Sequence, residues 1–328
     1  MSPAISKIDI SENALRNRGR ILDILLTDRT KTTKLKQHNI IWATDSYQQR
    51  YGKEAGKAYA PKKQILRVQI TGLNGKLIQP RAAKSKQEQL ARTKDKAEVF
   101  TPLKIVKQMN MAVDWASKNF PANDETWVDY IKELRLEITC GEAPFIAGRY
   151  NPTAHTGVVI EPKNRFGFFD RKLQVVGEFT RNKKDWLKYA EIALRACYGY
   201  EWQGDNLLIA RENALLTLDD FYKYFCKNKL TLKSKQNLTD EQLEYFAEII
   251  SWNIFQMDGL KYVLPMSCMH ETNIVKGIPT LFYDVPDIVE KNECEGCKFN
   301  RPTKHNGKYV KIMDWSNSKI IKFVDLLK

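Results

Sequence analysis

The sequence is poor in cysteine and has no long apolar run, and both shortages limit what the protein can be. Six cysteines spread over 328 residues do not suggest the disulfide framework of a small secreted domain. No apolar run approaches the roughly 18 residues needed to cross a bilayer, and no N-terminal signal pattern is present. We therefore expect a cytoplasmic protein without a membrane partner.

Acidic residues are outnumbered, and this imbalance indicates a polyanionic partner. The chain has 53 Lys and Arg against 39 Asp and Glu, a formal net charge of +14 and a pI of about 9.3. Basic surfaces attract nucleic acid, although lysine-rich solvated faces are also common. With 43% hydrophobic and 28% charged residues, the composition is that of an ordinary globular protein, with one large domain or two small ones.

One stretch of the sequence has a strand–turn–helix pattern. Apolar residues alternate with charged ones from Leu134 to Ile138, Cys140 and Gly141 predict a turn, and an apolar segment that we expect to begin a helix follows at Phe145. A glycine in such a turn lets the backbone approach a ligand, and a helix N-terminus offers free N–H groups. The pattern is typical of a nucleotide-type cofactor loop, but it also occurs in any α/β domain.

Three further segments flank this turn in a specific order. Residues 97–113 (AEVFTPLKIVKQMNMAV) contain an aromatic-Thr-Pro turn before a helix, 198–213 (YGYEWQGDNLLIAREN) predict a second strand ending in an acidic residue, and 253–260 (NIFQMDGL) predict a third strand ending near an aspartate. With LEITCGEAPF at the first turn, they resemble the motifs of adenine-N6 DNA methyltransferases, the modification (M) subunits of bacterial restriction-modification systems. The resemblance covers roughly residues 97–264, about half of the chain.

The resemblance implies an α/β fold, a cofactor and partners. The fold would be the Rossmann-like sheet of S-adenosylmethionine-dependent methyltransferases, and the partners would be DNA and another restriction-modification subunit. Glu201 would accept hydrogen bonds from the ribose hydroxyls of the cofactor, and Asp258 would contact its adenine amino group. The residues that the family's motifs assign to S-adenosylmethionine are Phe100, Thr101, Pro102, Glu137, Cys140, Gly141, Glu201 and Asp258.

The chain departs from the family at its catalytic motif. An Asn or Asp followed by Pro-Pro and an aromatic residue occurs nowhere in the sequence. The closest substitute is Asp314-Trp315, in which the carboxylate would orient the amine of a flipped adenine and the ring would stack on the base. In addition, Glu142-Ala143 stand where the family has Ser-Gly, and too little chain follows Trp315 for a complete seven-stranded sheet. The alternative function is a non-catalytic DNA-binding or assembly subunit with a degenerate methyltransferase fold.

The N-terminal region, residues 1–96, is basic and carries signals of its own. Ser11 is a candidate helix cap, and the alternating pattern of residues 64–78 with Asn74-Gly75 predicts a β-hairpin. The basic run 80–96, with Arg81, Lys84, Lys86 and Arg92, is either a contact for DNA phosphates or a solvated helix face.

An insertion relative to the family occupies residues 151–186. Its interleaved aromatic and basic residues suit a DNA-contacting flap, because bases stack on aromatic rings, but residues 173–176 are strand-like and we favour a packing hairpin. Helical spacing predicts helices over residues 184–197, over 207–225 and from Asp240 onwards.

The last segment, residues 265–328, contains a second group of candidate ligands. Cys294 and Cys297 have C-x-x-C spacing, with Cys268 and His270 before them and His305 after them. Two thiolates at this spacing can share one tetrahedral zinc, and the other residues can complete the site. We predict a structural zinc held by the three cysteines with either His270 or His305. A redox pair is the alternative, although it lacks the expected βα setting. The remaining thiols, which we expect to be free, are Cys140, Cys197 and Cys226.

Overall fold

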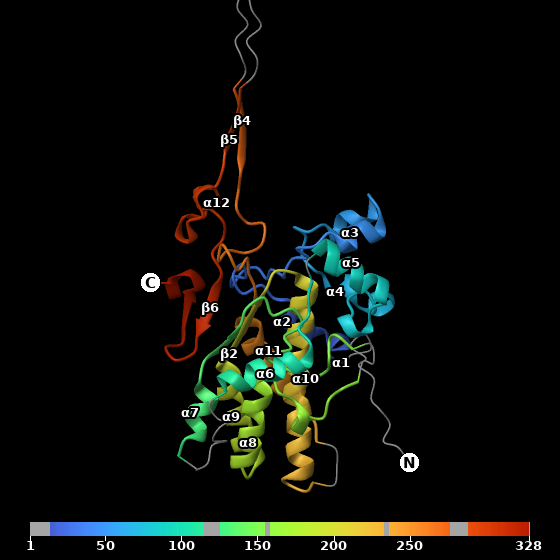
Figure 1. Cartoon of the computed structure of the whole chain (residues 1–328), viewed down its shortest axis with the longest axis vertical. Helices are drawn as coiled ribbons and strands as arrows, with labels where there is room; N and C mark the ends of the chain where they lie inside the picture. Colours follow the sequence, from blue (N-terminus) through green and yellow to red (C-terminus); the bar gives the residue numbers. More distant parts are fainter. Residues whose placement is uncertain are drawn as a thin grey trace, which may run out of the picture. The chain divides into compact units, whose positions relative to one another are not determined.

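A computed structural model describes residues 14–96, 98–114, 125–154, 158–232, 236–275 and 288–327, and Ser11 lies outside them. The chain divides into two compact units, Met1–Gln256 and Met257–Lys328 (Figure 1). The described part of the basic N-terminal region therefore belongs to the same unit as the three predicted strands. Within the described residues, no helix is long and apolar enough to cross a membrane.

The first unit is built around a small parallel sheet. The strands β1 (Arg135–Glu137), β2 (Cys197–Glu201) and β3 (Ile254–Gln256) lie in the order β1-β2-β3. Leu136 is paired with Tyr198, and Tyr200 is paired with Phe255. Since all three strands run in the same direction, their C-terminal ends lie at one edge of the sheet, where β2 ends with Glu201. The prediction of a mixed α/β fold with these three strands is confirmed.

Helices make up most of the rest of this unit. The longest, α10 (Gly204–Asn228), begins directly after β2, and Figure 1 shows it beside α8 and α9. Its apolar residues are buried along most of its length, which places the core between α10 and its neighbours. The other helices are α1 (Ala14–Asn17), α2 (Gly19–Leu26), α3 (Ser46–Tyr51), η1 (Ala55–Tyr59), α4 (Arg67–Ile70), η2 (Gly72–Asn74), η3 (Arg81–Ala83), α5 (Lys86–Lys96), α6 (Leu103–Val113), α7 (Trp127–Lys132), η5 (Pro162–Asn164), α8 (Phe168–Phe179), α9 (Lys183–Arg195) and α11 (Asp240–Asn253).

Two residues of the Ala-Arg-Glu-Asn segment on α10 bind the N-terminal helices to the sheet. The guanidinium of Arg211 donates to the carbonyl oxygens of Ile254, Leu25, Thr27 and Ser251. Glu212 forms a buried ion pair with Arg16 at 2.7 Å. The segment therefore has a packing role that the sequence pattern did not indicate, because its partners are some 40 to 196 positions away along the chain.

The predicted hairpin at residues 64–78 is wrong, because this segment forms α4 and η2. The side chain of Gln69 accepts a hydrogen bond from the backbone N–H of Leu66 at 2.9 Å, which caps the short helix. Gly75 has φ −55°, so the Asn-Gly pair does not form the turn with positive φ angles that a tight hairpin requires. The capping hydrogen bond and the burial of Ile70 stabilise a short helix here, although the alternating sequence pattern favours a strand.

The insertion is helical and not a hairpin. The strand-like residues 173–176 lie inside α8, where Phe169, Leu173 and Val176 are buried. A short, mostly apolar segment of this kind fits either a buried helix or a strand, and tertiary packing decided for the helix. In contrast, the predicted helices around α9, α10 and α11 are confirmed, since Trp186 and Leu194 are fully buried as expected.

Within the described residues, the second unit contains two antiparallel strand pairs and short helices. The strands β4 (Glu271–Val275) and β5 (Ile288–Asn292) form one pair, and β6 (Lys311–Asp314) and β7 (Lys319–Lys322) form the other. Between the pairs lie α12 (Glu295–Phe299) and η6 (Pro302–Lys304), and η7 (Phe323–Leu327) follows β7.

Candidate functional site

The second unit brings three cysteines and one histidine together. Cys268 precedes β4, Cys294 is the N-cap of α12, Cys297 lies in the same helix, and His305 follows η6. Their ligand atoms all lie within 4.8 Å of one another, so the group can hold a metal ion such as zinc. His270 is exposed and is not a member of the group. The choice left open by the sequence therefore falls on His305.

The distances within this group are those of a metal site and not of hydrogen bonds. Each of the three sulfur atoms lies 3.6 Å from His305 Nδ1. One ring nitrogen has one proton or one lone pair, so it cannot serve three sulfur partners. A tetrahedral zinc with Zn–S bonds of about 2.3 Å and a Zn–N bond of about 2.0–2.1 Å separates sulfur and nitrogen by about 3.6 Å. The donor set and its spacing therefore fit zinc.

Glycine and backbone groups around the cluster fix its geometry. A Cβ on Gly296, inside the C-x-x-C segment, would lie 2.6 Å from both the backbone nitrogen and Nδ1 of His305. The N–H of Asn306 donates to Cys294 Sγ at 3.2 Å, and the N–H of His305 donates to the hydroxyl of Tyr309 at 2.8 Å. Four protein ligands would complete the coordination of a bound zinc, which is typical of a structural metal and would leave no position for a substrate.

The first unit brings together three of the predicted cofactor residues. Gly141, at φ 55°, lies against the ring of Phe100, because a Cβ there would be 3.2 Å from Cε1 of that ring. The backbone N–H of Gly141 donates to Glu201 Oε2 at 2.8 Å. Since Glu201 ends β2 and the turn follows β1, these residues meet at the C-terminal edge of the parallel sheet. This edge is where ligands bind in open α/β sheets.

Glu201 is buried and retains acceptor capacity. Its Oε1 accepts a hydrogen bond from the N–H of Gln203 at 3.0 Å, and its Oε2 accepts the one from Gly141. A further backbone N–H, that of Trp202, also acts on the carboxylate, so three of its roughly four acceptor positions are used by the protein's own backbone. Burial raises the pKa of Glu201 to about 7, although the backbone N–H groups of Gln203, Gly141 and Trp202 act in the opposite direction. The carboxyl group is therefore poised to change charge near neutral pH.

The turn itself is tight and partly strained. The N–H of Ala143 donates to the carbonyl of Cys140 at 2.6 Å, and Ala143 has φ 60°, in the left-handed region that favours glycine. Cys140 is buried and its pKa is raised by burial. Ala143 thus occupies, at a backbone cost, the position where the resembling family has glycine.

The segment after the turn is not the predicted helix. The side chain of Glu137 accepts hydrogen bonds from the N–H groups of Phe145 and Ile146, which fixes this segment as a loop. Burial raises the pKa of Glu137 as well. Within the described residues, the next α-helix is α8. Glu137 is therefore occupied by the protein's own backbone, and its contribution to the site is to hold the turn in place.

The aromatic-Thr-Pro turn behaves as predicted, since the carbonyl of Pro102 accepts from Ile105 and Val106 as α6 begins. Phe100 is buried, Thr101 is half-buried and Pro102 is exposed. The guanidinium of Arg81 lies 5.2 Å from the centre of the Phe100 ring, a cation–π contact. Only Phe100 of the three is shown to contact the turn.

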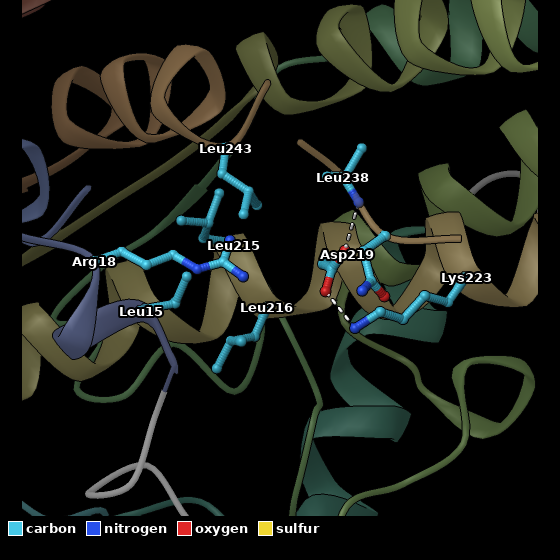
Figure 2. Close-up of a pocket in the computed structure, with 9 residues that line it drawn as sticks. Leu15, Arg18, Leu215, Leu216, Asp219, Lys223, Leu238 and Leu243 are labelled. Atoms are coloured by element: carbon cyan, nitrogen blue, oxygen red, sulfur yellow. Dashed lines mark hydrogen bonds and ion pairs between the residues drawn. The ribbon is translucent and has the colours of Figure 1, made fainter. Parts of the chain in front are cut away.

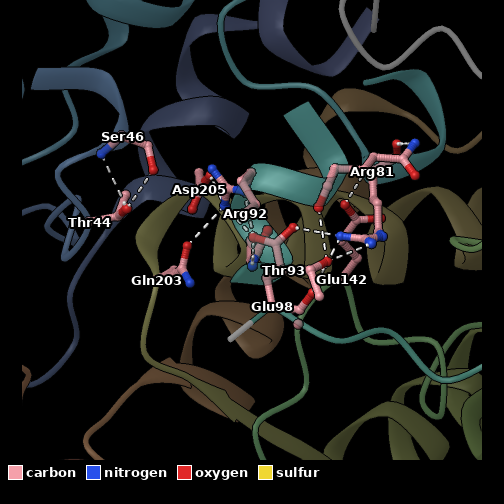
Figure 3. Close-up of polar contacts among 12 residues, drawn as sticks. Thr44, Ser46, Arg81, Arg92, Thr93, Glu98, Glu142, Gln203 and Asp205 are labelled. Carbon is pink, nitrogen blue, oxygen red and sulfur yellow. Dashed lines mark hydrogen bonds and ion pairs between the residues drawn. The ribbon is translucent and has the colours of Figure 1, made fainter. Parts of the chain in front are cut away.

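The basic run 80–96 contributes to a buried charge network beside the turn. Arg92 donates to Glu98 at 2.6 Å and to Asp205 at 2.8 Å (Figure 3). The backbone N–H of Arg81 donates to the buried carboxylate of Glu142 at 2.6 Å. Arg92 and Lys84 hold the pKa of Asp205 below its ordinary value, although burial alone raises it.

Three of the four residues predicted to contact DNA from this run therefore face inwards. Lys84 and Arg92 are each 5% exposed, and Arg81 is half-buried, whereas Lys86 is exposed. The sequence of a basic run does not indicate whether its charged side chains contact phosphates or buried carboxylates. The acidic partners Glu98, Glu142 and Asp205 were missed, because only the fold brings them to the arginines.

Three other predicted residues lie in the second unit and have local partners. The carboxylate of Asp258 accepts from the N–H groups of Leu260 and Lys261 at 3.0 and 3.3 Å, which makes it a turn-forming residue. Asp314, at the end of β6, accepts from Ser316 and Asn317, and these hydrogen bonds, with the side chain of Asn317 foremost, lower its pKa to about 2. Trp315, half-buried, follows it in the β6–β7 turn.

The described cavities do not coincide with these residues. Figure 2 shows one of about 230 Å³, in which Leu215, Leu216 and Leu243 surround the Arg18 side chain, with Asp219 and Lys223 beyond. No match to the chain was found among protein families, curated proteins or solved structures. The resemblance to methyltransferases consequently depends on the motif residues of the sequence alone.

Proposed function

We propose that the protein is an S-adenosylmethionine-dependent DNA adenine-N6 methyltransferase (M) subunit of a restriction-modification system. The observation that carries the proposal is the meeting of Phe100, Gly141 and Glu201 at the C-terminal edge of a parallel sheet. These residues come from three separate motifs, in the order in which that family has them. The order β1-β2-β3, with α10 directly after β2, supports the same Rossmann-like reading of the sheet.

The residues at this edge fit the chemical groups of the cofactor. The remaining acceptor capacity of Glu201 suits a ribose hydroxyl, and the missing side chain of Gly141 leaves room for the ring of Phe100 beside the turn. S-adenosylmethionine supplies an activated methyl group when bound. The protein's own residues would hold it and exclude water, and Phe100 would line one side of the turn.

A second function, a non-catalytic DNA-binding or assembly subunit, is favoured by Asp314. Its Oδ1 accepts from the N–H groups of Ser316 and Asn317 and from the hydroxyl of Ser316, while its Oδ2 accepts from the side chain of Asn317. A carboxylate that already forms four hydrogen bonds within its own turn is poorly available to orient the amine of a flipped base. The missing Pro-Pro-aromatic motif points in the same direction.

One experiment separates the two functions. The purified chain is incubated with DNA and labelled S-adenosylmethionine, alone and together with neighbouring gene products, and both cofactor binding and methyl transfer are measured. Binding with transfer supports the methyltransferase, and binding of cofactor and DNA without transfer in any combination supports the non-catalytic subunit. If calorimetry detects no cofactor binding, the methyltransferase reading of the fold is discarded.

DNA is the proposed partner because of the net charge of +14. Neutralisation of phosphates releases condensed counterions, so duplex affinity should fall steeply as salt rises. Of the four residues considered for this contact, only Lys86 is exposed, and its charge reversal tests the run without disturbing the buried network. An affinity that does not change with salt would exclude nucleic acid as an electrostatic partner.

For the metal group we propose structural zinc, which stabilises the second unit. Metal analysis of protein purified without chelator should find about one equivalent. The double variant Cys294→Ser, Cys297→Ser should lose the metal and melt at a lower temperature. Retention of both metal and thermal stability in that variant would refute this assignment.

A further inference from the structure

Exposed basic side chains gather on α3, η1 and the loop that follows them. Residues 45–66 contain five Lys and Arg against two Asp and Glu. All five basic residues are exposed, in contrast to the inward-facing residues of the run 80–96. We call them the α3–η1 basic surface, which consists of Arg50, Lys53, Lys57, Lys62 and Lys63.

Most of these charges have no counterion in the protein. The two acidic residues of the segment are already paired, Glu54 with Lys57 at 2.8 Å and Asp45 with Lys96. Within the described part of the chain, the other four basic side chains form no ion pair or hydrogen bond. These four, Arg50, Lys53, Lys62 and Lys63, can therefore contact an anionic partner without breaking a contact of the folded chain.

Close packing holds the surface in one shape. A Cβ on Gly56 would lie 2.3 Å from the carbonyl oxygen of Gln48, so η1 lies directly against α3. The rings of Tyr51 and Tyr59 stack with their centres 4.5 Å apart, and Tyr59 also contacts the fully buried ring of Trp42. Several cations on a packed scaffold can meet one partner without a flexible loop first being ordered.

The segment that precedes α3 is attached beside the end of β2. The carbonyl of Trp42 accepts a hydrogen bond from the N–H of Gly204 at 3.0 Å, and the carbonyl of Ala43 accepts one from the indole N–H of Trp202 at 2.9 Å. Trp202 directly follows Glu201, the last residue of β2. The α3–η1 basic surface is therefore anchored next to the C-terminal edge of the parallel sheet.

We propose that the α3–η1 basic surface binds the phosphate backbone of duplex DNA. Unpaired cations fit a polyanion, which releases condensed counterions when its phosphates are neutralised. Tyr51 and Tyr59 are half-buried and stack on each other, so the surface has little aromatic face for an unpaired base, which favours a duplex over a single strand. Phosphate contacts fix the position of DNA and do not select its sequence. The inference rests on the proposed function, in which DNA is the partner.

The test is the salt dependence of duplex binding by the full chain. Fluorescence anisotropy is measured with two labelled duplexes of unrelated sequence. The variant in which Arg50, Lys53, Lys62 and Lys63 are all replaced by Gln should bind both duplexes at least about tenfold more weakly at physiological salt. Each phosphate contact contributes about 0.9 to the slope of log K against log salt, so the slope should become shallower by about 3–4.

A matched control removes the same number of positive charges elsewhere in the first unit. Lys132, Lys184, Lys188 and Lys227 are exposed on α7, α9 and α10, and their replacement by Gln should leave duplex affinity and salt slope close to those of the wild type. A thermal melt of each variant checks its folding.

Calorimetry with S-adenosylmethionine separates this inference from the proposed function, because the four replaced residues are not among those proposed to hold the cofactor. Loss of duplex binding with unchanged cofactor binding supports the assignment. A wild-type chain that binds no duplex, or a variant that weakens no more than the control, overturns it even if the cofactor binds. DNA binding through this surface without any cofactor binding would keep the inference and refute the methyltransferase.

Discussion

Gly296→Ala is the sharpest test of the metal group, because it alters the site without removing a ligand. Its Cβ would lie 2.6 Å from the backbone nitrogen, Cγ and Nδ1 of His305. Heavy atoms do not approach so closely, and the neighbour includes backbone, so His305 must move. The ring nitrogen would then leave its place beside the sulfur atoms of Cys268, Cys294 and Cys297.

The expected loss of zinc affinity follows from the contribution of one ligand to the binding free energy. Structural zinc in small domains contributes an apparent free energy of about 10–16 kcal/mol. If the four ligands contribute equally, losing His305 costs roughly 3 kcal/mol, which is about two orders of magnitude in the dissociation constant. Competition against a chromophoric chelator measures this change directly.

Glu295→Ala is the control for this variant. Glu295 is the neighbouring residue of the same C-x-x-C segment, and its exposed side chain pairs only with Arg301, at 3.2 Å, among the contacts described for it. Its removal should leave zinc affinity unchanged. If Gly296→Ala binds zinc as tightly as the wild type while remaining folded, His305 is not a ligand and the geometric reasoning fails.

Four further predictions concern Glu201 at the C-terminal edge of the parallel sheet, the buried charges around Arg92, and the β6–β7 turn. Glu201→Ala should weaken S-adenosylmethionine binding by about 1.5–3 kcal/mol in calorimetry, the range for a hydrogen bond to a charged group, and unchanged affinity would remove Glu201 from the site. The pKa of Glu201 is raised to about 7, so between about pH 4.5 and pH 7 the folded chain keeps a proton that the unfolded chain has lost. The free energy of unfolding should therefore fall as pH rises through this range. Glu201→Gln should remove this pH dependence, measured by denaturant titrations. Arg92→Met leaves Glu98 and Asp205 buried without their cation and should destabilise the chain by about 3–5 kcal/mol, whereas exposed Lys86→Met should change its melting temperature little. Asp314→Ala should abolish methyl transfer and spare cofactor binding if Asp314 orients the target amine, and transfer that survives would exclude that role.

Some parts of the structure were predictable because their signals are local. Helical spacing identified the segments of α9, α10 and α11. The sequence pattern also predicted that the second strand ends with an acidic residue, Glu201. The C-x-x-C spacing of Cys294 and Cys297 likewise predicted half of a metal group. Each of these signals lies within a few positions of sequence, where backbone periodicity or ligand spacing leaves little choice.

Other predictions failed where two structures suit the same residues. The alternation of residues 64–78 fits a hairpin, but the side chain of Gln69 caps a helix there. Residues 173–176 fit a strand, but Leu173, Val175 and Val176 are buried within α8. After Gly141 a helix was expected, and the carboxylate of Glu137 instead holds a loop. In each case a contact outside the pattern decided the outcome.

The sequence by itself determined the parallel strands, the main helices, the basic charge and the cysteines of the metal group. Only the tertiary structure decided that His305 and not His270 completes that group, and that Lys84 and Arg92 are buried, with Arg92 paired to Glu98 and Asp205. The physical reason is the same for both. A ligand or a charge acts through its distance to partners and through its exposure to water, and both quantities are fixed by segments that are remote in sequence and adjacent in the fold.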